Sequence, residues 1–225
     1  MSFVDNVKED RKLQIMIGWS VFFLLAFPSY FAYAASSTDT VDSVGGPPGD
    51  YMIEGEFSYT EIGSGSAEVT EESPASVFAN SDAADVSDAN IVGARVTLTH
   101  TDDETRNGFG CTLPGGGSTQ DDEVTGVIMR DQYNASTSST DGTITFNVYW
   151  IDESAVGSTQ SNITKSEATA LVDGGNIGYG QYDLDISVAV NTGQSANGNC
   201  AYTDDGETVE WTIELTTLDY EIDEA

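Results

Sequence analysis

Acidic residues gather at three places after residue 100, each beside a stretch predicted to be a β-strand. The three clusters are Asp102-Asp103-Glu104, Asp121-Asp122-Glu123, and Asp204-Asp205 with Glu207. Calcium prefers six to eight oxygen ligands, often carboxylates from converging loops. If two of these clusters meet at one end of the domain, they form a calcium site, so Ca²⁺ is the candidate cofactor. None of them has the spacing of an EF-hand or repeat-type loop, and solvated turns are the favoured alternative.

The chain lacks the residues that most enzyme mechanisms need. His100 is the single histidine, and no G-x-S-x-G or other nucleophile motif accompanies it. Copper domains are excluded because they require more than one histidine, and Cys/His zinc sites fail in the same way, because one histidine and two cysteines are too few ligands. We expect His100 to be an exposed or capping side chain at a strand end. A carboxylate pair could hydrolyse a glycan, but acids are so frequent that no pair stands out, and no catalytic residue is assigned.

The charge balance restricts the partners. The chain has 38 acids and 7 bases, and from Ser36 onward it has 35 acids and four bases, a net charge of −31. Such a surface repels nucleic acid, so a DNA or RNA partner is not expected. It suits a soluble surface in salty water, or one that attracts cations.

The chain begins with a charged segment, residues 1–12, followed by an apolar segment, residues 13–35, that contains no charged residue. Twenty-three residues suffice for a transmembrane anchor. The alternative is a signal peptide cut after Ala34, which would give a secreted protein. The anchor is favoured, since residues 1–12 hold as many acids as bases. Lys8, Arg11 and Lys12 precede the apolar segment, which predicts a cytoplasmic N-terminus and an extracytoplasmic remainder.

Cys111 and Cys200 are the two cysteines of the chain, 89 positions apart. An even count in an exported protein predicts a disulfide, and closing so long a loop contributes about 4 kcal/mol on the chain-entropy model. Two free buried thiols are the alternative. Asn134-Ala135-Ser136 and Asn162-Ile163-Thr164 match the N-glycosylation acceptor pattern.

Residues 36–50 are rich in Ser, Thr, Gly and Pro and form a predicted flexible tether, followed by a domain over residues 51–225. Apolar residues in this domain alternate with polar ones, which indicates strands with one buried face. The segments are Tyr51–Tyr59, Val92–Leu98, Val124–Met129, Ile144–Trp150, Tyr182–Val190 and Val209–Leu215. The phase changes near Thr216-Thr217, which predicts a bulge. Ser166–Val172 is the best helix candidate, of one or two turns.

We therefore predict an all-β domain, an antiparallel two-sheet sandwich of the Ig-like or jelly-roll kind, with a closed barrel as the structural alternative. Trp150 and Trp211 lie on the apolar phase and are predicted core residues. Two connections, Thr101–Glu123 and Asn191–Glu207, are long, and each contains one cysteine. The disulfide is expected to join these two loops, or to fasten each to a neighbouring edge.

The strand Ile144–Trp150 and the segment Asp204–Ile213 resemble acidic extracytoplasmic β-sandwich proteins of archaeal cell surfaces. The resemblance implies a surface location and a binding or structural role, and it assigns no functional residue. We expect a membrane-anchored module that binds a protein, a glycan or the cell envelope. The alternatives are a carboxylate-dependent glycan hydrolase and an accessory subunit of a membrane complex.

Overall fold

The computed structural model describes residues 22–23, 46–101, 104–108, 111, 118–194 and 200–225. The chain forms two units, residues 1–48 and residues 49–225, and each is described by itself. Of the predicted anchor 13–35, Phe22 and Phe23 are described, both helical and with exposed rings, and the rest of the anchor lies outside the described residues. Among the residues that are described, no helix is long and apolar enough to cross a membrane.

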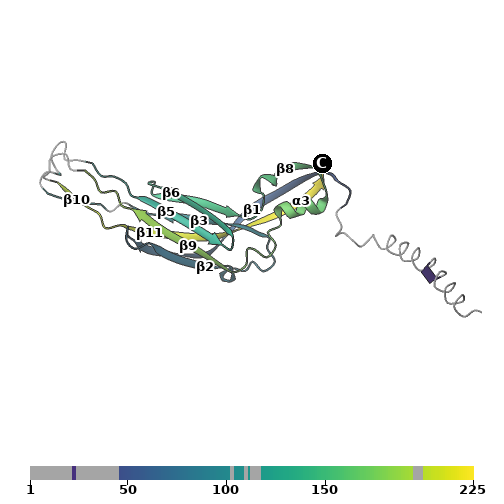
Figure 1. The fold of residues 1–225 in the computed structure, drawn as a ribbon, viewed down its shortest axis with the longest axis horizontal. Helices are drawn as coiled ribbons and strands as arrows, with labels where there is room; N and C mark the ends of the chain where they lie inside the picture. The colour runs from purple at the N-terminus through teal and green to yellow at the C-terminus, as the bar shows by residue number, and fades with distance from the viewer. Residues whose placement is uncertain (1–21, 24–45, 102–103, 109–110, 112–117, 195–199) are drawn as a thin grey trace, which may run out of the picture. The chain divides into compact units, whose positions relative to one another are not determined.

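The second unit is built from two antiparallel sheets that pack face to face (Figure 1). The five-stranded sheet has the order β7 (Thr143–Tyr149), β3 (Ile91–Thr99), β11 (Glu207–Glu224), β1 (Gly49–Val69) and β8 (Ser158–Ile163). The four-stranded sheet has the order β2 (Ala75–Asn80), β9 (Gln181–Ala189), β5 (Glu123–Arg130) and β6 (Tyr133–Ser139). A small ribbon pairs β4 (Thr105–Asn107) with β10 (Ala201–Thr203). The predicted antiparallel β-sandwich is confirmed.

Each alternating segment of the sequence forms a strand, and the five other described strands lack such a pattern. Three of these, β2, β6 and β8, are edge strands of the two sheets, and the other two, β4 and β10, form the small ribbon. An edge position does not by itself remove the alternation, because the edge strand β7 buries Ile144, Phe146 and Val148 in the main core. The predicted short helix is confirmed as α3 (Lys165–Val172), and two 3₁₀ turns, η2 (Ser81–Ala83) and η4 (Glu153–Ala155), complete the described elements of this unit.

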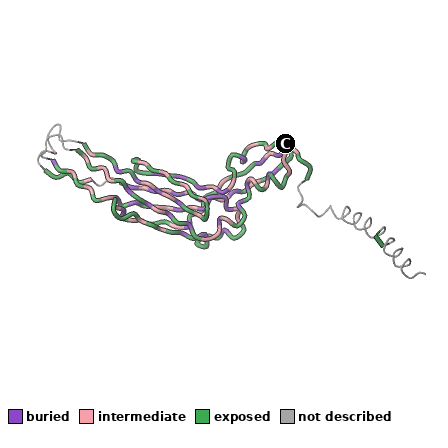
Figure 2. The backbone as a smooth tube through the Cα atoms, viewed as in Figure 1, coloured by how far each residue is buried: buried purple, intermediate pink, exposed green. Residues whose placement is uncertain are grey.

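The main core lies between the two sheets, and buried and exposed residues alternate along its strands (Figure 2). Its members are aliphatic and aromatic side chains from both sheets, among them Val96, Leu98, Ile128, Ile144, Phe146, Leu184, Ile186, Ile213 and Leu215. Burying each of the larger ones contributes about 1.5–3 kcal/mol. Trp150 is buried as predicted and donates its indole N–H to the Ile91 carbonyl at 2.8 Å. Trp211 is half-buried and packs against this core.

A second core lies on the opposite face of the five-stranded sheet. There, Ile53 of β1 and Leu218 of β11 pack with Ala168 and Val172 of α3. β1 changes the face that it buries at a bulge, because its register with β11 shifts between Glu61 and Gly63. After the bulge its odd-numbered residues face the main core.

The bulge predicted near Thr216-Thr217 is confirmed, and its extra residue belongs to β3. Thr216 pairs with Gly93 and Thr217 with Ile91, so Val92 is the inserted residue and turns into the second core. β11 keeps its alternation against β1 and buries its other face instead. The phase change in the sequence therefore marks the point at which β11 stops contributing side chains to the main core and begins to contribute them to the second core.

The domain has two distinct ends, which we call the tether end and the disulfide end. At the tether end, β1 begins at Gly49, and the Ala225 N–H donates to the Asp50 carbonyl at 2.9 Å. β1 runs for 21 residues, about 70 Å at the usual rise per residue. At the disulfide end, its last residue, Val69, pairs with Glu207, and the β4–β10 ribbon continues beyond the sheets (Figure 1).

Candidate metal centre

The disulfide end is closed by the predicted bond between Cys111 and Cys200, whose Cα atoms are 4.8 Å apart. The bond joins the two long cysteine-containing connections, as expected. Each of these connections also supplies one strand of the β4–β10 ribbon, where Thr105 pairs with Thr203. Pairing and disulfide together bring the second and third acidic clusters toward the same end of the sandwich.

Two acids lie on the inward phase of core strands at this end. Val124 of β5 and Val209 of β11 are buried in the main core. One inward step closer to the disulfide end, the same faces carry Asp122, which is 0% exposed, and Glu207, which is 1% exposed. The period of two residues that buries the valines therefore buries these carboxylates too.

Asp204 reaches the same place from the loop between β10 and β11. One of its carboxylate oxygens accepts the Gly206 N–H at 2.9 Å, which holds the loop in a tight turn. Its other oxygen, Oδ2, is buried and accepts no hydrogen bond among the described residues. Gly206 has φ +126°, and a Cβ there would lie 2.2 Å from the Val69 carbonyl oxygen, so only glycine fits the turn.

Asp122, Asp204 and Glu207 each place a carboxylate oxygen within 4.8 Å of the other two. Calcium–oxygen distances are about 2.4 Å, so two ligands of one ion are at most about 4.8 Å apart. The three oxygens are therefore close enough to share one ion, and an all-carboxylate ligand set suits a hard cation such as Ca²⁺. The Asp122 Oδ1 also accepts the Asn191 N–H at 2.7 Å, which ties the second cysteine-containing connection to β5.

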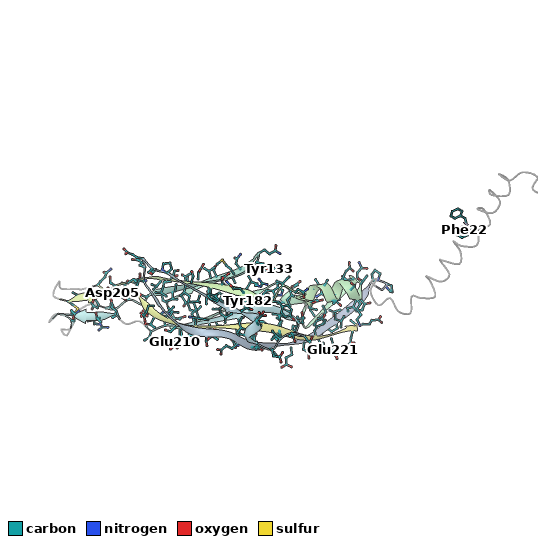
Figure 3. All side chains as sticks on the ribbon, turned by 90° about the horizontal axis from the view of Figure 1, so that it is seen from below. Phe22, Tyr133, Tyr182, Asp205, Glu210 and Glu221 are labelled. Atoms are coloured by element: carbon teal, nitrogen blue, oxygen red, sulfur yellow. A yellow bond between two sulfur atoms is a disulfide. The ribbon has the colours of Figure 1, made fainter. Side chains whose placement is uncertain are left out.

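The other predicted ligands lie elsewhere. Asp121, Glu123 and Asp205 are exposed, and Glu123 accepts the Ser138 hydroxyl at 2.6 Å. Glu104 is half-buried and accepts the Gly193 N–H through one carboxylate oxygen. Asp102 and Asp103 lie outside the described residues. The structure thus brings together one acid of the second cluster and two of the third; Figure 3 labels the neighbouring Asp205 at this end and Glu221 toward the other.

His100 is buried at the disulfide end, with 5% of its surface exposed, so the expectation of an exposed side chain is wrong. Its backbone N–H donates to the Gly142 carbonyl at 2.9 Å. It follows Leu98 on the inward phase of β3, and the pairing of Thr99 with Glu210 places it beside Val209 when extended by one residue. The sequence does carry a signal for the buried positions of His100, Asp122 and Glu207. The alternation of buried residues along β3, β5 and β11 continues into these polar residues.

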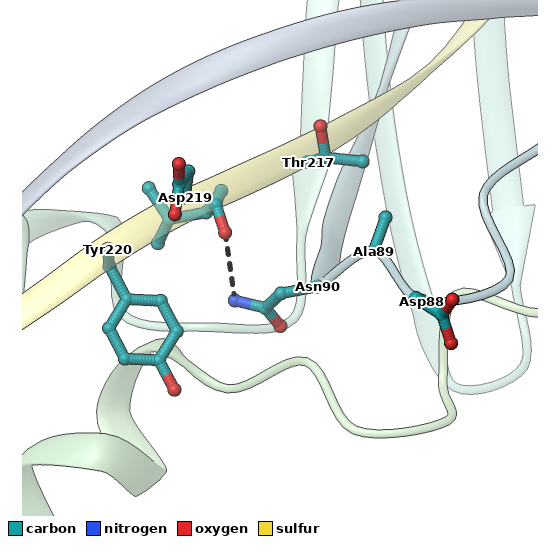
Figure 4. A pocket seen from close by; sticks show the side chains of 7 residues that line it. Asp88, Ala89, Asn90, Thr217, Asp219 and Tyr220 are labelled. Atoms are coloured by element: carbon teal, nitrogen blue, oxygen red, sulfur yellow. Dashed lines mark hydrogen bonds between the residues drawn. The ribbon is translucent and has the colours of Figure 1, made fainter.

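The surface of the domain has two hollows of interest, and one of them lies beside the candidate metal centre. One, of about 230 Å³, is lined by Glu68–Thr70, Thr105 and Thr203–Gly206, next to the candidate centre. The other, of about 330 Å³, lies between Asp88–Asn90 and Thr217–Tyr220 (Figure 4). In the second hollow, the Asn90 side-chain amide donates to the Val172 carbonyl at 2.9 Å and accepts the Gly174 N–H at 2.8 Å. Asn90 therefore connects the segment before β3 to the end of α3 and the residues after it.

Comparisons with known proteins do not place the chain in a family. No family model matches it, and no curated protein matches it. A solved structure titled Desmodium yellow mottle tymovirus is similar at 11% identity, with a TM-score of 0.25, over 79% of this chain and 86% of that one. A cryo-EM structure of Mud crab tombus-like virus is similar at 7% identity, with a TM-score of 0.26, over 85% of this chain and 99% of that one. These likenesses carry no conclusion about function.

Proposed function

We propose that this chain is a membrane-anchored extracytoplasmic module that acts as a binding or structural component of a cell surface. The observation that carries the proposal is the Cys111–Cys200 disulfide, which closes one end of the domain. Disulfides of this kind form and persist in oxidising compartments and are rare in the cytosol. The uncharged segment 13–35, with bases before it, supports export and anchoring in the same direction.

Strand order supports a jelly roll rather than an Ig-like sandwich. Apart from β8 and the β4–β10 ribbon, eight strands remain, and their sheet orders are β7-β3-β11-β1 and β2-β9-β5-β6. In chain order these are strands 6-3-8-1 and 2-7-4-5, the arrangement of a double Greek-key jelly roll. All four connections at the disulfide end then cross between the sheets. This fold class hosts many functions, so the site and the location carry the proposal.

The two-ended domain supports a display role. The predicted tether leads into the tether end, and the disulfide end lies at the far end of β1, about 70 Å along the strand. The disulfide end is therefore the end of the domain that lies farther along β1 from the point of attachment at Gly49. The resemblance to acidic archaeal surface proteins points the same way and remains a prediction.

Thiol labelling on intact cells tests the location, because Cys111 and Cys200 are the two cysteines of the chain. We expect a membrane-impermeant maleimide to label the protein only after an impermeant reductant is added. A Ser2→Cys variant provides the cytoplasmic control, since its added thiol should react only after lysis. Free thiols at positions 111 and 200 that react only after lysis would overturn the proposal. Intact mass of the same protein separates an anchor from a chain cut after Ala34.

We also propose that Asp122, Asp204 and Glu207 bind Ca²⁺ and brace the disulfide end. Three carboxylates within 4.8 Å repel one another, and burial of two of them strengthens that repulsion. A divalent cation among them would relieve it and would join β5, β11 and the loop after β10. Ligand oxygens from the backbone and from water would complete a coordination shell of six to eight.

Neighbouring acids supply matched controls for this site. We expect millimolar Ca²⁺ to raise the melting temperature of the wild-type protein and of Asp121→Asn and Asp205→Asn. Asp122→Asn and Glu207→Gln should lose the increase, because they remove ligands, whereas the control positions are exposed. An absence of heat in calorimetry together with an unchanged melting temperature in Ca²⁺ would remove the metal from the proposal and leave the location untouched.

The hydrolase alternative has less support. Glycosidases need two carboxylates that reach a sugar from an open cleft. Of the closest acids here, Asp122 and Glu207 are buried, and neither lines the two hollows described above. The accessory-subunit alternative depends on residues 13–35, nearly all of which lie outside the described residues.

A further inference from the structure

The two acceptor patterns for N-glycosylation lie in different local structures. Asn134-Ala135-Ser136 is part of β6, and Asn162-Ile163-Thr164 crosses the junction between β8 and α3. The pattern requires both an asparagine amide and a hydroxyl two residues later, so a transferase must reach both groups. Accessibility of the pair therefore separates the two candidates once the domain has folded.

Asn134 and Ser136 form an open pair. β6 is an edge strand that pairs with β5, and its two pattern residues are both exposed. In a strand, residues two apart point to the same side. The amide of Asn134 and the hydroxyl of Ser136 therefore face outward together, on the face of the four-stranded sheet that is turned away from the main core.

The hydroxyl of Thr164 is already engaged. Thr164 caps α3: its hydroxyl donates to the Glu167 carboxylate at 2.9 Å and accepts the Glu167 N–H at 3.2 Å. The Thr164 N–H also donates to that carboxylate at 2.7 Å, which completes a capping box. Asn162 has φ +58°, and its backbone N–H donates to Asp50. Asn162 is exposed, but the Thr164 hydroxyl becomes available to a transferase only if this capping box opens.

We propose that Asn134 is glycosylated in the folded domain, that Asn162 is not, and that the attached sugar covers Met129. The inference rests on the proposed export of the domain. The Asn134 Nδ2 would attack the anomeric carbon of a lipid-linked sugar, form the C–N bond and lose one proton. The lipid phosphate or diphosphate would leave with the electron pair of the broken C–O bond, so no redox partner is needed.

The position of Met129 supports its coverage by the sugar. Met129 pairs directly with Asn134, and opposed side chains on neighbouring strands begin about 5 Å apart. Met129 is 36% exposed, and Val127, two residues before it on the same face, is half-buried. The first sugar on Asn134 would therefore lie beside a small apolar area on an otherwise polar face.

Site-resolved mass spectrometry of the protein from its native membrane is the first test. We expect glycopeptides that contain Asn134, unmodified peptides that contain Asn162, and loss of the glycan in Asn134→Gln but not in Asn162→Gln. An unmodified Asn134, or occupancy at Asn162 that equals or exceeds that at Asn134, would overturn the inference. Maleimide labelling of Cys111 and Cys200 in the same preparation reports export separately, so the two proposals fail in distinguishable ways.

Methionine oxidation tests the coverage. Dilute peroxide should oxidise Met129 several-fold more slowly in the glycosylated protein than in Asn134→Gln. Met52, which is half-buried on β1, serves as the internal reference and should oxidise at the same rate in both. Equal rates at Met129 would show that the sugar does not cover it.

Discussion

Tyr149 lies on the outer face of the five-stranded sheet, where its ring covers Gly93. A Cβ at Gly93 would be 2.6 Å from the Tyr149 Cδ1, so the ring occupies the space that a larger residue would need. Nearby, the Arg95 Nε lies 2.8 Å from the Glu214 Oε2, and the Arg95 guanidinium carbon lies 3.5 Å from the centre of the Tyr59 ring. These side chains form a compact aromatic and charged cluster on a face otherwise rich in threonine.

Burial in this cluster raises the pKa of Tyr149 to about 12, and the neighbouring Tyr59 adds to the effect. Since the pKa in the folded state exceeds the unfolded value of 10, the associated stability is complete below pH 10. It is lost as the pH rises toward 12. NMR of ¹³Cζ-labelled tyrosine, assigned with Tyr149→Phe, should give a titration midpoint near 12 for this residue. A midpoint near 10 would contradict the packing described here.

The tight turn at Gly206 has no room for a side chain. Gly206→Ala should destabilise the domain by about 2–3 kcal/mol, because the new Cβ would clash with the Val69 carbonyl and the backbone would be strained. Gly157→Ala is the control, since Gly157 has φ +77° but nothing within 4 Å of its Cβ position, and it should cost about 1 kcal/mol. Urea unfolding gives both values. Equal losses would mean that the clash with Val69 is relieved by a small shift.

The candidate metal centre could be predicted from the sequence only in part. The acidic clusters pointed to calcium, but nothing in their composition distinguished Asp122 from the exposed Asp121 and Glu123 beside it. Strand phase makes that distinction, because Asp122 continues the inward row that ends in Val124. The same reasoning applied to Leu98 would have placed His100 inside. A change from apolar to polar side chains resembles the end of a strand, although the alternation of a strand continues whatever the side chain is.

At the scale of elements, β1 and β11 show why the sequence predicts where strands lie better than it predicts which core each face of a strand packs against. Both strands bury one face against the four-stranded sheet and the opposite face against α3. The change of phase after Thr216 was visible, but it could be read either as a bulge or as a second core. Deciding between them requires Val92 and α3, which come from distant parts of the chain.

The β4–β10 ribbon depends on its disulfide more than any other described pairing of strands. Each strand has three residues, and a ribbon this short is at best marginally stable in water. In the Cys111→Ser/Cys200→Ser double variant, the free energy of unfolding should fall by about 4 kcal/mol, since the closed loop spans 89 positions.

Hydrogen exchange checks the local part of this prediction. Amides of Thr105–Asn107 and Ala201–Thr203 should exchange much faster in the double variant, whereas the centre of β3 should follow the global stability. Unchanged protection in the ribbon would show that pairing alone holds it, and the candidate metal centre at its base would then be the next element to remove.

At the scale of the whole molecule, the architecture followed from composition and periodicity, while the details of charge did not. An all-β sandwich closed by one disulfide was predictable, because alternation over long segments leaves few other ways to bury one face. The pairing of like charges was not, since it depends on register. Glu54 lies directly opposite Glu221, and Glu56 directly opposite Asp219, on a ribbon that begins at the tether end.

This charge distribution predicts that salt stabilises the domain. The part of the chain from Ser36 onward has a net charge of −31, and like charges opposed across strands are destabilising. Raising NaCl from 0.01 M to 1 M shortens the screening length from about 30 Å to about 3 Å. The melting temperature, measured with EDTA present so that calcium plays no part, should therefore rise steadily over this range.

A charge reversal separates the local contribution from the global one. Glu54→Lys converts the pair with Glu221 into an attractive one and should raise the free energy of unfolding at low salt by up to about 1 kcal/mol. Glu71→Lys changes the net charge equally, but Glu71 lies in the turn after β1 and has no opposed acid in the β1–β11 ladder, so it should gain less. The difference between the two variants should shrink in 1 M NaCl, because screening removes the attraction as well as the repulsion. If the free energy of unfolding rises equally in the two variants at every salt concentration, the domain responds to its total charge alone. The opposed acids of the paired strands β1 and β11 then have no effect of their own.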